Sequence, residues 1–260
     1  MKNLRQRILD GETLLGCFLN LGSSVTAEIV GKAGFDFLVI DLEHGSGTEA
    51  DVLPQLQALE ATPAAAIIRV ESHARQRVHR VLDWGAHGIM FPRVDSPEEA
   101  ASCVAALRYP PAGVRGVAAM NRACEFGTRF REYVESAPQT LLGVFQIETE
   151  QALRHLDAIA SLDGVDVLFV GPLDLSMSLG VLGDFSHPRF QQAVQAVSHA
   201  AHRSGKAAGI LLPQPSDFQH YYSLGYRFLA CGSDGSVLAQ AARNLAAQLR
   251  AARDAVQQRS

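Results

Sequence analysis

Short apolar runs alternate with longer amphipathic segments along the whole chain. Several runs are apolar at every position rather than at every second one, which is typical of parallel strands covered on both faces. The pattern predicts eight strands, at residues 14–19, 37–41, 65–70, 88–91, 142–147, 166–170, 207–212 and 227–230.

Predicted helices occupy the intervals between these strands. The one that starts at Ser96 has the clearest signature, because a serine N-cap precedes a proline and two glutamates. The last predicted helix, from about Ser236 to Val256, aligns four apolar residues on one face: Leu238, Ala242, Leu245 and Leu249. The other predicted helices lie at residues 25–34, 74–84, 150–161, 188–204 and 216–224.

Eight such alternations predict an α/β fold, a (β/α)₈ TIM barrel, as one domain over residues 1–260. A doubly wound open sheet is the alternative, but no GxGxxG signature follows the first strand, where the chain reads Gly22-Ser23-Ser24. The long interval between the fourth and fifth strands is rich in proline and glycine at residues 108–116. We interpret it as an insertion rather than a linker between domains.

Composition narrows the function classes. The 260 residues are 47% hydrophobic and 19% charged, and 23 Lys and Arg against 27 Asp and Glu give a net charge of -4. Without a basic excess, nucleic acid is not expected as a partner. No apolar stretch approaches the roughly 18 residues of a membrane helix, and the first residues lack a signal-peptide pattern. Four cysteines without a CxxC pair suit a reducing cytoplasm.

Candidate chemistry gathers at the predicted strand ends, because barrel active sites lie at the carboxyl ends of the strands. Polar residues stand there after four different strands, which predicts one polar pocket that could hold a metal. They are Asp41, Glu43 and His44 after the second strand, Arg69 at the third, Gln146 and Glu148 at the fifth, and Asp174 after the sixth.

Two carboxylates on adjacent strand ends, Glu148 and Asp174, suit Mg²⁺ or Mn²⁺. The alternative is that each caps the helix that follows it. His44 stands between a strand and a glycine, where it could act as a general base or serve a structural role. Arg69 requires an anion, either an internal partner such as Asp41 or a substrate group.

Two further segments leave alternatives open. Asp83 ends a predicted helix just before the fourth strand, at the amino end of the barrel. It is either a surface acid or, if it takes part in catalysis, it does so in a neighbouring subunit. Residues 231–235, Cys-Gly-Ser-Asp-Gly, could bind a phosphate, but a turn that caps the last helix is favoured.

Taken together, these residues resemble the signature of the HpcH/HpaI family, the metal-dependent (class II) 2-oxo-acid aldolases. Residues 34–45 carry the likeness most fully. Further matches follow in the family's order over nearly the whole chain, and as a set they are highly specific. They lie at residues 82–86, 108–111, 113–116, 146–148 and 171–176.

The resemblance implies a homo-oligomer, usually a hexamer built as a trimer of dimers that exchange their last helix. It implies Glu148 and Asp174 as ligands of a divalent metal ion (Mg²⁺, Mn²⁺ or Co²⁺), with no organic cofactor. The implied substrate contacts are Gln146, Arg69 and the backbone of Leu173 and Asp174. The implied catalytic residues are His44 as general base, Arg69 as enolate stabiliser, and Asp83, which acts on the histidine across a subunit boundary.

We therefore expect reversible retro-aldol cleavage of a 4-hydroxy-2-oxo acid to pyruvate, or a close 2-oxo acid, and an aldehyde. A class I mechanism is disfavoured, because the only lysines are Lys2, Lys32 and Lys206, and Lys206 precedes the seventh strand on the wrong face. Leu173, where the family often has alanine, and Phe18, where tryptophan is common, leave the aldehyde open. Succinate semialdehyde and tartronate semialdehyde both suit the family.

Two other functions remain as alternatives. A citrate-lyase-like enzyme acting on an acyl-CoA thioester would need a basic patch for the phosphates, and the sequence shows none. A barrel without catalysis, acting as a binding protein, is disfavoured by the intact set His44, Arg69, Glu148 and Asp174.

Overall fold

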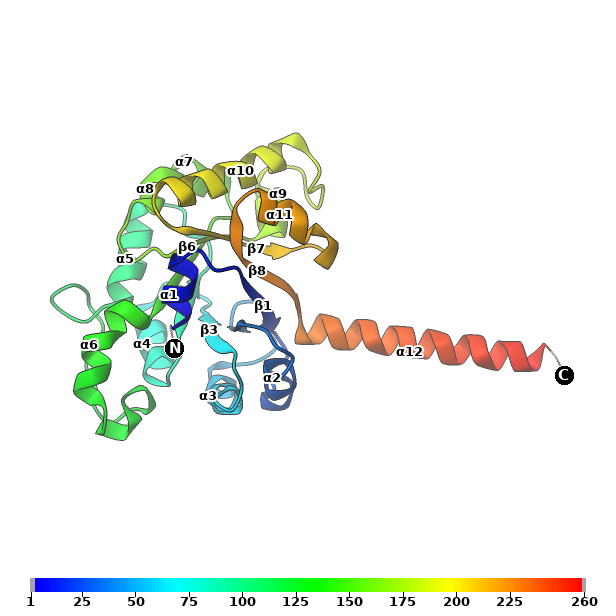
Figure 1. Cartoon of the computed structure of the whole chain (residues 1–260), viewed down its shortest axis with the longest axis horizontal. Helices are drawn as coiled ribbons and strands as arrows, with labels where there is room; N and C mark the ends of the chain where they lie inside the picture. The colour runs from blue at the N-terminus through cyan, green and yellow to red at the C-terminus, as the bar shows by residue number, and fades with distance from the viewer. Residues whose placement is uncertain (1–2, 259–260) are drawn as a thin grey trace.

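Eight parallel strands close into a barrel, and most of the helices surround it (Figure 1). This computed structural model describes residues 3–258. Each strand pairs with the next along the chain and β8 pairs with β1, so the sheet has no free edge. The strands are β1 (Leu14–Leu19), β2 (Phe37–Asp41), β3 (Ala65–Arg69), β4 (Gly88–Phe91), β5 (Leu142–Gln146), β6 (Val167–Val170), β7 (Ala207–Leu212) and β8 (Tyr226–Ser233).

The closed barrel confirms the predicted (β/α)₈ fold and excludes the open sheet. Every strand lies where the sequence predicts it, with small changes at the ends. β3 and β5 end one residue earlier, at Arg69 and Gln146, and β6 begins one residue later, at Val167. β8 runs longer at both ends, because Cys231 pairs with β7 and Ser233 pairs with β1.

The helices depart more from the prediction. Residues 150–161 form two short helices instead of one, because the backbone leaves helical geometry at His155 (φ -102°, ψ 8°). Four helices were not predicted. Two of them, α3 and α6, each contain a proline, which normally argues against a helix (Pro54 and Pro138). The other two, α1 and α9, are too short to show a helical period. The helices are α1 (Leu4–Leu9), α2 (Ser24–Gly31), α3 (Glu49–Leu59), α4 (Arg75–Asp83), α5 (Pro97–Leu107), α6 (Phe130–Thr140), α7 (Glu150–Arg154), α8 (Leu156–Ala160), α9 (Pro172–Ser178), α10 (Pro188–Arg203), α11 (Phe218–Ser223) and α12 (Asp234–Gln257), with 3₁₀ turns η1 (Arg122–Gly127) and η2 (Pro215–Asp217).

Side chains fill the interior of the barrel. The rings of Phe37 and Phe228 stack with their centres 3.8 Å apart. Gly16 makes room for them, since a Cβ there would lie 2.2 Å from the Phe37 ring. Leu4 and Ile8 of α1 join this inner cluster from the amino end. The barrel is therefore closed at its amino end, and the carboxyl ends of the strands remain for chemistry.

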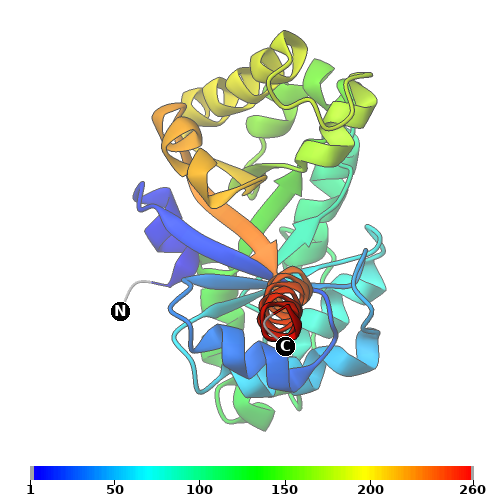
Figure 2. The ribbon, with the colours of Figure 1, turned by 90° about the vertical axis from the view of Figure 1, so that its right-hand side faces the viewer.

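Helix α12 extends away from the barrel (Figure 1), and Figure 2 shows it end-on. It begins at Asp234, two residues before the predicted start, because Ser233 caps it by accepting a 3.1 Å hydrogen bond from the Ser236 N–H. Asp234 is buried and accepts a 2.8 Å hydrogen bond from the backbone N–H of Asn20. Residues 231–235 thus form the helix cap, the interpretation that the sequence favoured.

The predicted apolar face of α12 is present, but it does not pack on the barrel. Its apolar side chains are exposed, namely Val237, Leu238, Leu245, Leu249 and Val256. Among residues 3–258, no helix is both long enough and apolar enough to cross a membrane.

Candidate active site at the carboxyl end of the barrel

The loop after β2 is folded around the Asp41 carboxylate. Its Oδ1 accepts hydrogen bonds from the backbone N–H groups of Glu43 (3.0 Å) and His44 (3.2 Å). Gly45 allows this tight turn, because a Cβ there would lie 2.1 Å from the Asp41 carbonyl oxygen. The backbone at His44 is thereby fixed, while its side chain stays 64% exposed with Nε2 3.9 Å from Glu43. The imidazole is available to a substrate at the mouth of the barrel.

Arg69, the last residue of β3, is buried and bound by two carboxylates. Its Nε and Nη2 donate to the two oxygens of Asp41 at 2.9 and 2.7 Å, and its Nη1 lies 3.1 Å from Glu43. The guanidinium also stands over the Phe18 ring, 5.1 Å from its centre. Burial acts to raise the pKa of Asp41, but hydrogen bonds and charge from Arg69 outweigh it and hold that pKa below its usual value. Of the two alternatives for Arg69, the internal ion pair is present.

Glu148 follows β5 and is 2% exposed. Its Oε1 accepts from the backbone N–H of Arg93 (2.8 Å) and its Oε2 from the Gln146 amide (2.7 Å). Gly171 leaves space for it, since a Cβ there would lie 2.4 Å from Oε2. Burial, and then the nearby charges of Asp174 and Glu43, raise the pKa of Glu148 to about 7. This carboxylate is therefore only partly ionised in neutral solution, and a bound cation would favour its ionised form.

Helix α9 brings Leu173 and Asp174 to the same rim, in the first turn after β6. Both side chains are exposed. The first backbone N–H groups of a helix have no acceptor within it, so those of Leu173 and Asp174 are free to bind an anion. Pro172 begins the helix and has no N–H to offer.

The donor set of this rim fits a hard divalent cation. The carboxylates of Asp41, Glu43 and Glu148 lie near Arg69, and that of Asp174 lies near Glu43 and Glu148. The buried Oε1 of Gln146 has no hydrogen-bond partner, so an oxygen donor is left over beside Glu148. Within residues 3–258, no three His, Cys, Asp or Glu side chains are arranged to hold a metal by themselves. The rim would thus supply a few oxygen ligands and leave the others to water and substrate.

Known proteins resemble this chain over most of its length. The model of the HpcH/HpaI aldolase/citrate lyase family matches residues 14–241. The hydroxypyruvate/pyruvate aldolase of Chromohalobacter salexigens is 41% identical over 242 residues, covering 93% of this chain and 95% of that protein. A 5-keto-4-deoxy-D-glucarate aldolase of Shigella boydii is 40% identical over 232 residues, covering 89% and 90%. A solved family member from Burkholderia cenocepacia has a TM-score of 0.90 at 39% identity, covering 95% of this chain and 98% of that one.

The chain belongs to the HpcH/HpaI aldolase/citrate lyase family. The most similar relatives named above are aldolases, and aldolases break or form a carbon–carbon bond. The protein is therefore an enzyme, a carbon–carbon lyase. The rim described above is its candidate active site.

Asp83 is the one residue of the predicted catalytic set that this aldolase does not bring to the rim. It is the last residue of α4, just before β4, and its carboxylate pairs with Arg115 at 2.9 Å. The structure thus places Asp83 at the amino end of its own barrel, as the sequence indicated.

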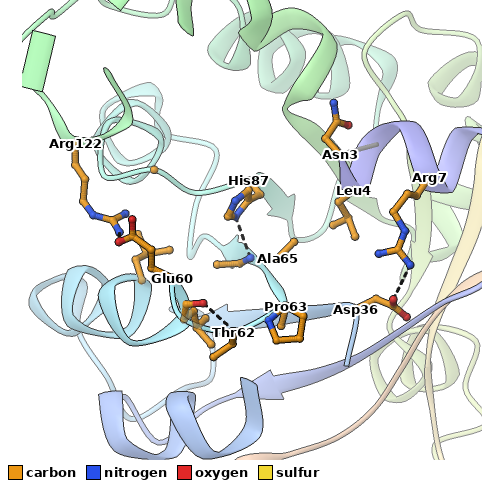
Figure 3. Close-up of a pocket in the computed structure, with 15 residues that line it drawn as sticks. Asn3, Leu4, Arg7, Asp36, Glu60, Thr62, Pro63, Ala65, His87 and Arg122 are labelled. Atoms are coloured by element: carbon orange, nitrogen blue, oxygen red, sulfur yellow. Dashed lines mark hydrogen bonds and ion pairs between the residues drawn. The ribbon is translucent and has the colours of Figure 1, made fainter. Parts of the chain in front are cut away.

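A cavity of about 430 Å³ opens at the amino end of the barrel, opposite the rim (Figure 3). Its charged side chains already satisfy one another, as Arg7 pairs with Asp36 at 2.7 Å and Arg122 pairs with Glu60. His87 accepts a hydrogen bond from the Ala66 N–H through Nδ1. These pairings leave the cavity without the carboxylate excess found at the rim, so the rim remains the candidate active site.

Sequence reasoning missed one contributor to the rim and part of the role of another. Arg93 takes part through its backbone N–H, in a left-handed conformation (φ 44°) that is uncommon outside glycine. No side-chain pattern could have revealed a backbone donor. Asp41 was predicted at the rim and as a possible partner of Arg69, but its role in organising the loop that carries His44 was not. The adjacent polar residues Glu43 and His44 were the available signal.

Proposed function

We propose that this enzyme is a metal-dependent class II aldolase that cleaves a 4-hydroxy-2-oxo acid into pyruvate, or a close 2-oxo acid, and an aldehyde. One observation carries the proposal. A buried carboxylate, Glu148, whose pKa is about 7, lies beside Asp174 and Glu43 and close to Arg69, at the open end of an aldolase-family barrel. A cation bound here would offset this negative charge, and the site could then stabilise an oxyanion.

Glu148 and Asp174 would hold the cation, which we take to be Mg²⁺, Mn²⁺ or Co²⁺. When bound, such an ion supplies Lewis-acid stabilisation to negative charge on the 2-oxo oxygen. Gln146 donates one amide hydrogen to Glu148, and its second is free for the substrate. Together with the backbone N–H groups of Leu173 and Asp174, Gln146 would bind the carboxylate of the 2-oxo acid.

His44 acts as the general base and removes the proton of the C4 hydroxyl. The electron pair left on that oxygen forms the aldehyde carbonyl, the C3–C4 bond breaks, and its electron pair passes into the enolate of the 2-oxo acid. Arg69 donates two of its five N–H groups to Asp41, and its Nη1 lies 3.1 Å from Glu43, so N–H groups remain to donate to the enolate oxygen. Protonation at C3 then gives pyruvate.

The relatives suggest which aldehyde the enzyme uses. One is named for hydroxypyruvate and pyruvate and the other for 5-keto-4-deoxy-D-glucarate, so both names point to hydroxylated carbon chains. We therefore favour a hydroxylated aldehyde such as tartronate semialdehyde over succinate semialdehyde. The exposed Leu173 lies at the rim and would limit the space for the aldehyde.

We further propose that the enzyme is a homo-oligomer, a hexamer built from dimers that exchange α12. The exposed leucines of α12, such as Leu245 and Leu249, require a cover that their own barrel does not supply. In that assembly Asp83 would reach the site of a neighbouring subunit and hydrogen-bond His44. The site would then be complete only in the oligomer.

Pyruvate release from a panel of 4-hydroxy-2-oxo acids tests the function. We expect release to stop with EDTA and to return with Mg²⁺, Mn²⁺ or Co²⁺. The Asp174→Ala variant should show no metal-dependent turnover, whereas Asp184→Ala, at an exposed turn after α9, should behave as wild type. Release that EDTA does not affect would refute the metal assignment. No release with any substrate, but cleavage of a CoA thioester, would favour the lyase alternative.

A further inference from the structure

A buried arginine outside the rim holds the Asp83 carboxylate. Arg115 lies in the segment between α5 and η1, and its side chain is 0% exposed. Its Nη2 donates to Asp83 Oδ1 at 2.9 Å. The guanidinium lies over two aromatic rings, 4.6 Å from the centre of Tyr109 and 5.2 Å from that of Tyr133. The guanidinium is therefore held by two aromatic rings and by the carboxylate of Asp83.

Stability alone does not account for this arginine. Its Nε and Nη1 are buried and have no hydrogen-bond partner, and one ion pair seldom compensates the desolvation of two charges. An apolar side chain of similar volume would fill the same space between Tyr109 and Tyr133 without leaving donors unpaired. Two interactions here need a cation: the contacts of the guanidinium with the two aromatic rings, and the ion pair with the Asp83 carboxylate. Of these, only the ion pair fixes a charged group that is partly exposed.

The Asp83 carboxylate is held by one oxygen, and the other is left free. Among residues 3–258, no group donates a hydrogen bond to Oδ2, and the side chain is 23% exposed. The titratable groups that face it are Arg115, His79, Cys124, Tyr109 and Tyr133. Burial raises the pKa values of Cys124, Tyr109 and Tyr133 and lowers that of His79, so these four groups stay neutral at neutral pH. Arg115 is therefore the only cation of the five groups that face Asp83.

We propose that Arg115 is a positioning residue, which fixes Asp83 so that its free oxygen points outward to the ring N–H of His44 in a neighbouring subunit. This inference rests on the proposed role of Asp83 in a shared site. Arg115 touches neither substrate nor metal. It acts by holding an acceptor at the place where a second copy of the chain presents its base.

An arginine suits this task better than a lysine does. The flat guanidinium stacks on Tyr109 and Tyr133 and so has one orientation, whereas an ammonium group on a flexible stem has no plane to stack. Arg115→Lys should therefore retain the charge and lose the orientation. The kcat of this variant should lie between that of wild type and that of a neutral replacement.

The experiment is a double-mutant cycle of Asp83→Asn and Arg115→Met, with kcat and KM measured by metal-dependent pyruvate release. Arg115→Met should lower kcat by about 10- to 100-fold, the usual effect of losing a supporting partner, with KM nearly unchanged. In the Asp83→Asn background it should lower kcat no further, because the two residues act as one unit. Arg115→Lys should fall in between.

Arg108→Met is the matched control. Arg108 lies in the same segment between α5 and η1, and it also pairs with an aspartate, Asp163, at 2.9 Å. We expect it to keep the wild-type kcat. Thermal midpoints and subunit counts for every variant show whether folding or assembly has changed, and Arg115→Lys serves if Arg115→Met does not fold.

Three results would overturn the inference at different levels. If Asp83→Asn lowers kcat but Arg115→Met does not, or if their effects on kcat are additive, Arg115 is structural and the proposed function is untouched. If Asp83→Asn retains the wild-type kcat, the shared site itself is wrong. If wild-type protein releases no pyruvate with any metal, the proposed function fails first.

Discussion

At the scale of single residues, the rim is a balance between one guanidinium and several carboxylates. Arg69 forms ion pairs with Asp41 and Glu43, but its single charge cannot balance both, and Glu148 remains buried with its pKa raised to about 7. The residues that hold the His44 loop in place thus leave a net negative charge at the rim, with Glu148 as its most buried carboxylate.

Replacing Arg69 with alanine should lower kcat by about 10²–10³, because the site loses a preorganised donor to the enolate oxygen. Steady-state pyruvate release measures this effect, and circular dichroism monitors the fold, since Asp41 is left unpaired. Arg69→Lys should retain more activity than alanine does, because it keeps the charge. A kcat close to wild type in Arg69→Ala would show that the arginine serves only the ion pair with Asp41.

Metal binding should strengthen as the pH rises through about 7, the value to which burial raises the pKa of Glu148. Because this folded-state pKa lies above the unfolded one, the fold favours the protonated acid, and the metal must displace that proton. Affinity for Mn²⁺ should fall about tenfold between pH 8 and pH 6. The Mn²⁺-induced rise in thermal midpoint at the two pH values measures it.

Glu148→Gln is the control for that titration, since it removes the acid and keeps the side-chain shape. Its thermal midpoint should respond weakly to Mn²⁺ at both pH values. An equal response of wild-type protein at pH 6 and pH 8 would exclude Glu148 as a ligand that titrates in this range.

At the scale of elements, α12 differs from the other helices in having no barrel surface beneath it. The cap at Ser233 and the buried Asp234 fix where it starts, and beyond Asp234 its side chains are at least partly exposed through residue 257. Isolated helices are only marginally stable in water. An apolar stripe on an extended helix is therefore a surface that a second copy of the chain would cover.

Charges on that stripe should prevent assembly. The double variant Leu245→Glu and Leu249→Glu should elute as a smaller species than wild type in size-exclusion chromatography with light scattering, because buried carboxylates would be unpaired. Ala247→Glu, on the opposite face of the helix, should keep the wild-type mass. An unchanged mass in the double variant would reject α12 as the contact between subunits.

At the scale of the whole molecule, the two ends of the barrel have different roles. The carboxyl end gathers His44, Arg69 and Glu148, whereas Asp83 lies at the amino end beside Arg115. A single chain cannot bring these ends together, because the filled barrel separates them. If Asp83 serves catalysis, the active unit is at least two chains.

Complementation tests this arrangement. Co-expressed His44→Ala and Asp83→Asn chains should together recover about a quarter of wild-type activity, since in a random mixture one interface in four joins two intact residues. Each variant alone should be nearly inactive, and the pyruvate assay measures all three samples. If the mixture is no more active than the two variants alone, then His44 and Asp83 act in the site of the same chain, or Asp83 acts in no active site.

The sequence by itself determined the barrel and the rim. Apolar runs of strand length marked all eight strands, and the rule that parallel strands end on one face placed His44, Arg69, Glu148 and Asp174 together. It located helices less well where prolines or short lengths hid the period, as in α3 and α9. Periodicity is a local property of the chain, and so the sequence can show it directly.

Only the tertiary structure decided how those residues are paired. Asp41 meets Arg69 across 28 positions, the Arg93 N–H meets Glu148 across 55, and Arg115 meets Asp83 across 32. The pKa of Glu148 depends on burial and on neighbours from other strands. Such contacts arise from packing between segments that are distant in the chain, and the spacing of residues along a sequence does not encode them.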